Sequence, residues 1–269
     1  MKNRSIFLPV VTGLGFLFLY APIASLIVFS FNESKLVTVW GGFSTKWYGE
    51  LLRDPQILGA AWISLKIAFL SATLAIIIGT VAAFALSRFP KFRTKSLLNW
   101  MITAPLVMPD VIIGLSLLLM FVAMQGLIGW PAGRGMTTII IAHATFGAAY
   151  AAVVIQSRLV DMDMSIEEVA LDLGAKPMRV FFDITLPVIA PALVSGWLLA
   201  FTLSLDDLVI ASFVSGPGSS TLPMVIFSKV RLGVSPDVNA LATIIILIIS
   251  VGIIAAAIQI SRSGKKLGN

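Results

Sequence analysis

The sequence predicts an all-α membrane protein with six transmembrane helices. Of its 269 residues, 58% are hydrophobic, and the mean hydropathy is +0.99. A soluble domain with a polar surface does not reach such values. Six apolar runs are each long enough to cross a bilayer as a helix, which takes about 20 residues. They cover residues 6–31, 60–86, 97–124, 137–155, 188–214 and 239–260.

The first run is expected to be a retained span, although basic residues precede it as in a secretory signal peptide. Its 26 residues exceed a typical signal core, and no clear A-x-A cleavage site follows. The chain, residues 1–269, is therefore expected to be a single transmembrane domain. Cysteine is absent, which excludes disulfides and cysteine-ligated metals but says little about compartment.

The distribution of basic residues predicts which side of the membrane each connection faces. Nine basic residues and no acid lie in the N-terminus, the second connection and the tail: Lys2, Arg4, Arg88, Lys91, Arg93, Lys95, Arg262, Lys265 and Lys266. The first, third and fifth connections carry six basic residues over longer stretches, together with acids. The positive-inside rule therefore predicts that both termini are cytoplasmic, in agreement with an even number of spans. Membrane anchoring also explains the net charge of +6 without a nucleic-acid partner.

The long first and fifth connections are expected to lie outside the cytoplasm. The first, residues 31–55, carries Trp40, Trp47 and Tyr48, aromatic side chains suited to the membrane interface. Residues 46–53 can form a short amphipathic helix. We expect this connection to be a docking surface for an external partner.

The fourth connection, residues 157–187, is cytoplasmic by the count of crossings and is densely charged. Six of its nine charged residues are acidic. Ser165 and Glu168 have the spacing of a capping box, which predicts a helix that begins at Ile166. Gly174 and Pro177 predict the end of this helix and the first turn of a second one. The first helix carries an apolar stripe of Ile166, Val169, Ala170 and Leu173.

Two interpretations fit this acidic helix. A position on the inner membrane surface is disfavoured, because anionic headgroups repel carboxylates and interfacial helices favour Lys and Arg. Docking to a protein fits better, since small Ala170 lies at the centre of the apolar face and Glu168 and Asp172 can pair with basic residues. The segment is therefore expected to enter a groove on a partner.

The same segment resembles the EAA loop of bacterial ABC importer permeases. The match is E-V-A-x-x-x-G, followed by nine residues and I-x-L-P, in the connection before the penultimate span. Val169 stands where the family usually has alanine, a conservative difference. The resemblance implies the type I ABC importer permease fold and a coupling helix that docks into a cytoplasmic ATPase. The implied coupling residues are Glu168, Val169, Ala170, Leu173, Gly174, Ile184, Leu186 and Pro187.

The chain itself is expected to be a transport subunit and not an enzyme. The sequence contains no G-x-x-x-x-G-K-[ST], the loop that cradles nucleotide phosphates. No cofactor or metal is expected in this chain, and ATP and Mg²⁺ are expected in the partner ATPase.

Three acids fall within the apolar runs and are the candidate residues of a substrate pathway: Asp110, Asp206 and Asp207. A carboxylate in hydrocarbon costs about 2.5–3.5 kcal/mol on the insertion scale, so each should face protein, water or a cation. Pro105 and Pro109 are expected to interrupt the helix before Asp110, as in broken helices that line cavities. Such carboxylates suit an organic cation with separated ammonium groups.

A structural role for these acids stays open, because they can pair with Lys66, with His143 or with a basic residue of a partner. Lys66 is expected to snorkel to the interface, since it lies near the outer end of its span. His143 is expected to make interhelical hydrogen bonds and not to bind a metal, because no second ligand lies four residues away.

Longer stretches resemble the second permease subunit of polyamine importers, in particular putrescine systems. The likeness covers about residues 16–243 and includes LVTVWGGFSTKWYGELLRD, ITAPLVMPDVIIGLSLLL and GWLLAFTLSLDDLVIASFVSGPGSSTLP. It implies uptake of a polyamine, putrescine before spermidine, across the bacterial inner membrane. The implied partners are a second permease subunit, two copies of an ATPase and a periplasmic polyamine-binding protein.

Three alternatives fit parts of the sequence. A permease for spermidine or another solute would share the fold. An ion-coupled secondary transporter would use Asp110 and Asp207 to carry protons, but it predicts inverted repeats, and the sequence shows no repeat. A membrane scaffold that transports nothing would not need buried acids.

Overall fold

The computed structural model describes residues 7–36, 39–89, 91–233 and 236–266, with the backbone alone for 252–253 and 255–266. These residues are almost entirely helical, and an isolated β-bridge joins Asn32 to Phe43. In chain order the helices are α1 (Phe7–Phe29), α2 (Lys46–Leu51), α3 (Pro55–Arg88), α4 (Lys95–Val107), α5 (Asp110–Ile128), α6 (Met136–Asp161), α7 (Ser165–Asp172), α8 (Pro177–Val180), the π-helical turn η1 (Phe181–Thr185), α9 (Leu186–Asp206), α10 (Val209–Val214), α11 (Leu222–Leu232) and α12 (Pro236–Lys266).

Five helical stretches of the described chain are long and apolar enough to cross a membrane: Phe7–Phe29, Pro55–Arg88, Asp110–Ile128, Met136–Asp161 and Pro177–Asp206. The described side chains of α12 add a shorter apolar stretch, Pro236–Val251, at the start of the sixth expected span. Lys2 and Arg4, which contribute to the predicted orientation, lie outside the described residues.

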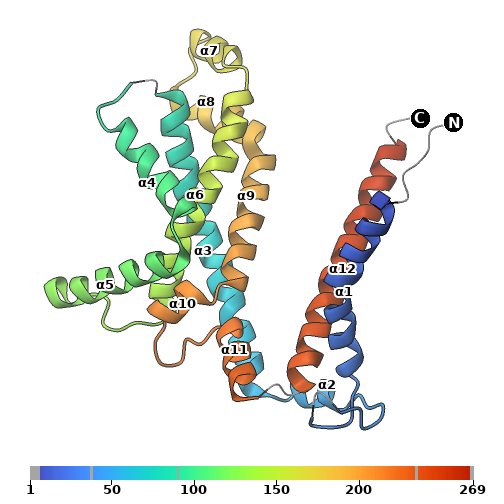
Figure 1. Cartoon of the computed structure of the whole chain (residues 1–269). Helices are drawn as coiled ribbons and strands as arrows, with labels where there is room; N and C mark the ends of the chain where they lie inside the picture. The colour runs from blue at the N-terminus through green and yellow to red at the C-terminus, as the bar shows by residue number, and fades with distance from the viewer. Residues whose placement is uncertain (1–6, 37–38, 90, 234–235, 267–269) are drawn as a thin grey trace. The chain divides into compact units, whose positions relative to one another are not determined.

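The chain divides into two compact units. Unit 1 comprises Met1–Leu58 and Ile226–Asn269, and unit 2 comprises Gly59–Val225, so the boundaries fall within α3 and α11. In unit 1, α12 contacts both α1 and α2. Unit 2 contains the remaining helices, which Figure 1 shows from α3 through α10.

Asn32 organises the loop of unit 1 that follows α1. Its buried side-chain amide donates to the carbonyl oxygens of Leu36 at 3.2 Å and Val39 at 2.8 Å, and its amide oxygen accepts from the Gly41 N–H at 2.8 Å. Trp47 donates from Nε1 to the Asn32 carbonyl oxygen at 2.6 Å. Trp47, predicted to lie at the membrane interface, is therefore buried against its own loop.

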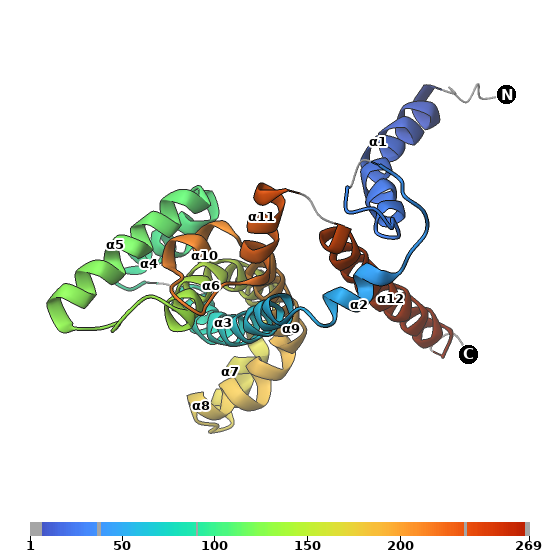
Figure 2. The ribbon, with the colours of Figure 1, turned by 90° about the horizontal axis from the view of Figure 1, so that it is seen from below.

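In unit 2, α3, α6 and α9 run side by side, as both views of the ribbon show (Figures 1 and 2). Glycine and alanine let these helices approach closely, which is typical of helix packing in membranes. A Cβ atom on Gly79 of α3 would lie only 2.9 Å from the Cβ of Ala151 in α6. One on Gly147 of α6 would lie 3.2 Å from the Cβ atoms of Ala75 and Ala200. The three helices therefore form a tightly packed bundle.

Two of the expected spans are interrupted. Residues 97–124 form α4 and α5, because Pro109 disfavours helical backbone in Met108, which is extended with ψ 139°. Residues 188–214 form α9 and α10, with Asp207 extended between them at ψ 124°. Beyond these breaks α5 packs against α10 so closely that a Cβ on Gly114 would lie 2.6 Å from the Phe213 ring. Both breaks place an acid at or beside a helix end.

Candidate functional site

Helix α7 lies at one end of the unit 2 bundle, next to α8 (Figure 1). It begins at Ser165, but the predicted capping box is wrong, because Met164 occupies the cap position and its side chain makes no capping hydrogen bond. The Asp163 carboxylate accepts a hydrogen bond from the Ser165 N–H at 3.0 Å, which lowers the pKa of Asp163. Glu168 is exposed.

The end of α7 follows the prediction. Gly174 has a left-handed backbone with φ +89°, which only glycine adopts readily. The N–H of Ala175 bonds to the Ala170 carbonyl oxygen at 3.0 Å, and the N–H of Gly174 bonds to the Leu171 carbonyl oxygen at 2.9 Å. These bonds close the helix in a Schellman-type turn. Pro177 then opens α8, as predicted.

The faces of α7 are reversed relative to an ordinary surface helix. Ile166, Val169 and Leu173 are 49%, 56% and 84% exposed, and Ala170 is half-buried. Glu167, by contrast, is only 8% exposed. Helix α7 therefore carries an exposed apolar stripe, although Glu167 in its first turn is buried.

Glu167 is held by residues from several elements of the bundle. Its Oε2 lies 2.7 Å from Arg88 Nε, and its Oε1 accepts hydrogen bonds from Arg88 Nη2 at 3.2 Å and from Thr185 Oγ1 at 2.6 Å. Arg88 Nη1 also donates to the Leu159 carbonyl oxygen at 3.0 Å. This cluster could not be predicted from the sequence, because Arg88 has the position of an anchoring charge and neither periodicity nor the motif singles out Glu167.

The second half of the EAA-like motif lies on the bundle side of the segment. Ile184 belongs to η1, and Leu186 and Pro187 begin α9. Leu186 packs against a buried cluster: Ala83, Ala151, Ile155, Leu159 and Ile189. Leu186 thus anchors the connection to the bundle, Ile184 is half-buried and Pro187 is exposed.

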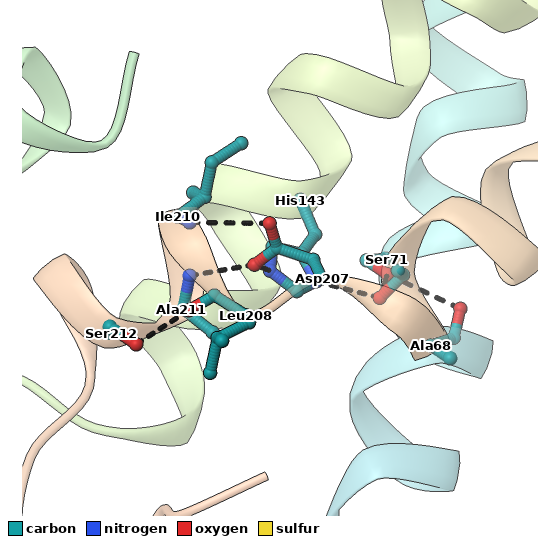
Figure 3. A network of polar contacts seen from close by, with 9 residues as sticks. Ala68, Ser71, His143, Asp207, Leu208, Ile210, Ala211 and Ser212 are labelled. Carbon is teal, nitrogen blue, oxygen red and sulfur yellow. Dashed lines mark hydrogen bonds and ion pairs between the residues drawn. The ribbon is translucent and has the colours of Figure 1, made fainter. Parts of the chain in front are cut away.

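Of the three predicted acids, Asp207 is fully engaged within the chain (Figure 3). Its Oδ2 lies 3.0 Å from Nε2 of His143 in α6. Its carboxylate also accepts hydrogen bonds from the N–H groups of Ile210 at 3.2 Å and Ala211 at 2.7 Å, at the start of α10. Asp207 therefore stabilises the new helix after the break, because it satisfies donors that have no partner within α10.

The hydrogen-bond chain continues from His143 into α9 and α3. His143 Nδ1 lies 2.7 Å from Ser204 Oγ, and Ser71 Oγ donates to Ser204 Oγ at 3.1 Å. An ionised Asp207 can only accept, so Nε2 of His143 donates to it; with the other ring nitrogen unprotonated, Nδ1 accepts from Ser204. The predicted interhelical role of His143 is confirmed.

Asp110 and Asp206 are placed differently from Asp207. Both are exposed in the described chain, Asp110 in the first turn of α5 and Asp206 at the last residue of α9. Lys66 pairs with neither acid and instead lies with its Nζ 5.0 Å from the ring centre of Trp62, a cation–π contact. The structure thus separates one partnered acid from two that face outward.

Relatives of known name share most of the chain. The "Putrescine transport system permease protein PotI" of Escherichia coli (strain K12) is 65% identical over 237 residues, which cover 88% of this chain and 84% of PotI. The "Spermidine/putrescine transport system permease protein PotC" of the same strain is 42% identical over 252 residues, which cover 94% of this chain and 92% of PotC.

Solved structures of permeases share the fold. A bacterial ABC transporter that imports the acidic polysaccharide alginate matches with a TM-score of 0.72 at 19% identity, and the match covers 94% of both chains. The same kind of transporter in complex with an alginate pentasaccharide-bound periplasmic protein matches with a TM-score of 0.70 at 16% identity, covering 96% of this chain and 92% of that one. The predicted all-α permease fold is confirmed.

The family model described as "Binding-protein-dependent transport system inner membrane component" matches residues 75–267. These residues include the reversed helix α7, the Glu167 cluster and all three intramembrane acids. The chain is a multi-pass membrane protein and belongs to this family of transport permeases.

Proposed function

We propose that the chain is one permease subunit of an ATP-driven ABC importer that carries a polyamine, putrescine in particular, from the periplasm to the cytoplasm. The 65% identity to PotI over 88% of the chain supports putrescine, and the 42% identity to PotC supports a polyamine more broadly. The observation that carries the proposal is α7, whose apolar side chains are exposed although a carboxylate beneath them is buried.

Helix α7 is the proposed coupling helix. Ile166, Val169 and Leu173 form its docking face, and exposed Glu168 and Asp172 are available to basic residues of an ATPase. Gly174 turns the chain directly after this face. ATP and Mg²⁺ bind to the ATPase, and the permease contributes no phosphate-binding loop.

The proposed substrate pathway contains Asp110, Asp206 and Asp207. Asp110 and Asp206 are exposed in this chain, so their carboxylates can face the ammonium groups of a polyamine between two permease subunits. Asp207 lines the same break with its carboxylate held by His143 and by two backbone N–H groups. We assign it mainly to shaping the pathway and the two exposed acids to contact with substrate.

The proposed complex contains a second permease subunit, two ATPase subunits and a periplasmic polyamine-binding protein. The proposed orientation, with both termini in the cytoplasm, follows from the positive-inside rule. Reporters that fold only outside the cytoplasm should be active when fused near Gly133 or Gly218. They should be inactive near Lys91, Lys176 or Asn269, and a reversed pattern would contradict the orientation.

Reconstitution tests the function as a whole. The permease pair, the ATPase and the binding protein are placed in liposomes, and uptake of labelled putrescine and spermidine is measured with and without ATP. We expect uptake that needs both ATP and the binding protein, with putrescine preferred. ATP-independent uptake driven by a proton gradient would contradict the proposal.

A further inference from the structure

The pair of Arg88 and Glu167 is a buried ion pair at the end of a membrane span. The exposed fractions of the two side chains are 8% and 11%. In the same segment, Arg179 of α8 pairs with Asp183 of η1 at 3.1 Å, but these side chains are 78% and 60% exposed. The two pairs have similar chemistry and different surroundings, so they are expected to differ in role.

A buried ion pair adds little net stability, because the loss of hydration opposes the attraction between the charges. The pair instead restricts orientation, because a guanidinium and a carboxylate fit together in few arrangements and any other arrangement leaves a buried charge without a partner. Arg88 and Glu167 therefore select one orientation of α7 on the bundle. An exposed pair such as Arg179 and Asp183 imposes no such restriction, because water solvates the separated charges.

The cluster joins four elements that are distant in sequence. Arg88 is the last residue of α3, Leu159 belongs to α6, Glu167 lies in the first turn of α7, and Thr185 ends η1 immediately before α9. Through Arg88 and Glu167, α7 is thus tied to α3, α6 and η1, and η1 leads directly into α9. The acid faces inward, so the docking face of α7 is left for another protein.

We propose that Arg88, Glu167 and Thr185 are positioning residues that clamp α7 to the bundle, so that movement of a docked ATPase passes to α3, α6 and α9. The inference rests on the proposed function of α7 as the coupling helix. In this role the clamp affects the efficiency of coupling and not the affinity for the ATPase, since none of its side chains belongs to the exposed face.

The experiment compares variants in the reconstituted complex. Arg88→Met removes one partner, and Arg88→Met combined with Glu167→Met removes both without leaving an unpaired buried charge. Arg88→Lys keeps the charge without the planar fork. Arg179→Met removes the exposed pair in the same segment and serves as the matched control. Copurification of the ATPase, ATP hydrolysis and polyamine uptake are measured for each variant.

We expect every variant that assembles to keep the ATPase bound. In the variant with both Met substitutions, the amount of polyamine transported per ATP hydrolysed should fall at least about tenfold, because the loss of one charge-assisted hydrogen bond corresponds to about that factor. Arg88→Lys should be intermediate, and Arg179→Met should match the wild type. If the paired variant keeps the wild-type ratio of transport to hydrolysis, the clamp is disproved, even where Arg88→Met alone fails to fold.

A distance measurement provides a readout that does not depend on transport. The sequence has no cysteine, so spin labels can be placed at exposed Val81 of α3 and exposed Leu171 of α7. We expect a narrow distance distribution in the wild type and in Arg179→Met, and a broad one in the paired Met variant. An unchanged distribution in that variant would overturn the clamp. Absence of ATP-dependent uptake in the wild type would instead contradict the proposed function.

Discussion

Two polar clusters lie at opposite ends of α9, and both involve α3 and α6. The first, at its start, links Arg88 of α3 and the α6 backbone to Glu167 and Thr185. The second, at its end, links Ser71 of α3, His143 of α6 and Asp207. The 21 residues of α9 separate them by about 30 Å.

The two clusters differ in the kind of group they use. The first contains a permanently charged guanidinium that pairs with a carboxylate. In the second, one carboxylate bonds to an imidazole and to two backbone N–H groups, and the imidazole bonds in turn to a hydroxyl group. Arg88 stands at the end of its helix, where a full charge costs less than within the apolar span. The first cluster therefore suits a fixed attachment, and the second suits a helix break that must remain hydrogen-bonded within the membrane.

The largest effect is expected from the surface that the first cluster holds in place. Gly174→Asp places a charged side chain at a backbone with φ +89°, which glycine adopts most readily, beside the docking face. We expect complete loss of ATP-dependent uptake with normal membrane insertion. Glu168→Lys, which reverses a charge on the exposed rim of α7, should have the same result.

Gly174→Ala is the control for this prediction, because it shares the backbone strain and adds only a methyl group. Apart from Gly174 and its two chain neighbours, no heavy atom of the described residues lies within 4 Å of the Cβ position, so the loss of uptake in Gly174→Ala should be partial. Uptake and ATPase copurification are measured for all three variants. Full activity and copurification with Gly174→Asp would show that α7 is not the coupling helix.

Substitution of Asp207, a member of the second cluster, is compared with substitution of its exposed neighbour Asp206. Asp206→Asn removes a charge from an exposed acid, so uptake should fall about tenfold to a hundredfold while the thermal stability of the protein stays unchanged. Asp207→Asn weakens bonds to His143 and to α10, so it should lower the free energy of unfolding by about 1.5–3 kcal/mol. Thermal unfolding and polyamine uptake are measured together, with Asp110→Asn expected to resemble Asp206→Asn.

Two outcomes would contradict these roles, and one measurement serves as a control. Wild-type uptake in Asp110→Asn, Asp206→Asn and Asp207→Asn would eliminate the cation pathway. Loss of stability in all three would assign them to helix packing. Binding of polyamine to the periplasmic partner should not change in any variant, because that step takes place on another protein.

A smaller effect is expected from Thr185, the neutral member of the first cluster. Thr185→Val keeps the shape of the side chain but removes its 2.6 Å hydrogen bond to Glu167. We expect a loss of about 1–2 kcal/mol in the free energy of unfolding and a weaker effect on coupling than in the paired Met variant. Thr202→Val is the control, since exposed Thr202 of α9 bonds only to its own helix in the described contacts. Equal effects of the two substitutions would contradict the cluster.

The smallest effect is expected outside the bundle, where Lys229 of unit 1 lies 3.0 Å from Asp54 and 2.8 Å from Asp237. Burial alone would raise the pKa of Asp54, but hydrogen bonds from Lys229 and two backbone N–H groups hold that pKa below 3.8. Burial likewise opposes the charge of Lys229, but the two acids raise its pKa above 10.5. These groups are partly exposed, so their contribution is about 1 kcal/mol or less.

The signs of these shifts define a pH window. The lowered pKa of Asp54 gives stability that is present above pH 3.8 and lost as the pH falls through the folded value. The raised pKa of Lys229 gives stability that is present below pH 10.5 and lost as the pH rises through the folded value. Protection of the α2 amides, which is their exchange rate relative to that of an unstructured peptide at the same pH, should therefore be constant between these limits and weaker below and above them. Lys229→Met should abolish the alkaline limb and weaken the acid limb, because the two backbone N–H groups still bond to Asp54; an unchanged alkaline limb would assign it to other groups.

Much of the fold could be predicted from the sequence, because apolar length and turn chemistry act locally. Pro109 indicates the interruption before Asp110, and Gly174 and Pro177 mark the turn after α7. The predicted capping box was wrong because residue spacing alone does not determine the backbone of Ser165. Ser165 is the first helical residue, and its N–H donates to the Asp163 carboxylate. The break after Asp206 lacks a proline and was missed, since it depends on contacts of Asp207 with α6.

The candidate site was predictable only in part. The motif identifies α7, and the rarity of acids within apolar runs identifies Asp110, Asp206 and Asp207. Which of these acids has a hydrogen-bond partner depends on the position of α6, so pairing with His143 stayed an open alternative in the sequence. The link between Arg88 and Glu167 spans 79 positions, and one sequence has no signal for such a contact.

The small-residue packing between α3, α6 and α9 has a mechanical consequence. Gly79 and Gly147 leave no room for a side chain between neighbouring helices, so these helices cannot slide past one another without steric overlap. The three helices are therefore expected to move together as one rigid body. A tilt applied at the α7 end should therefore reappear about 30 Å away at the break beside Asp206, where it would widen or narrow the route for a cation.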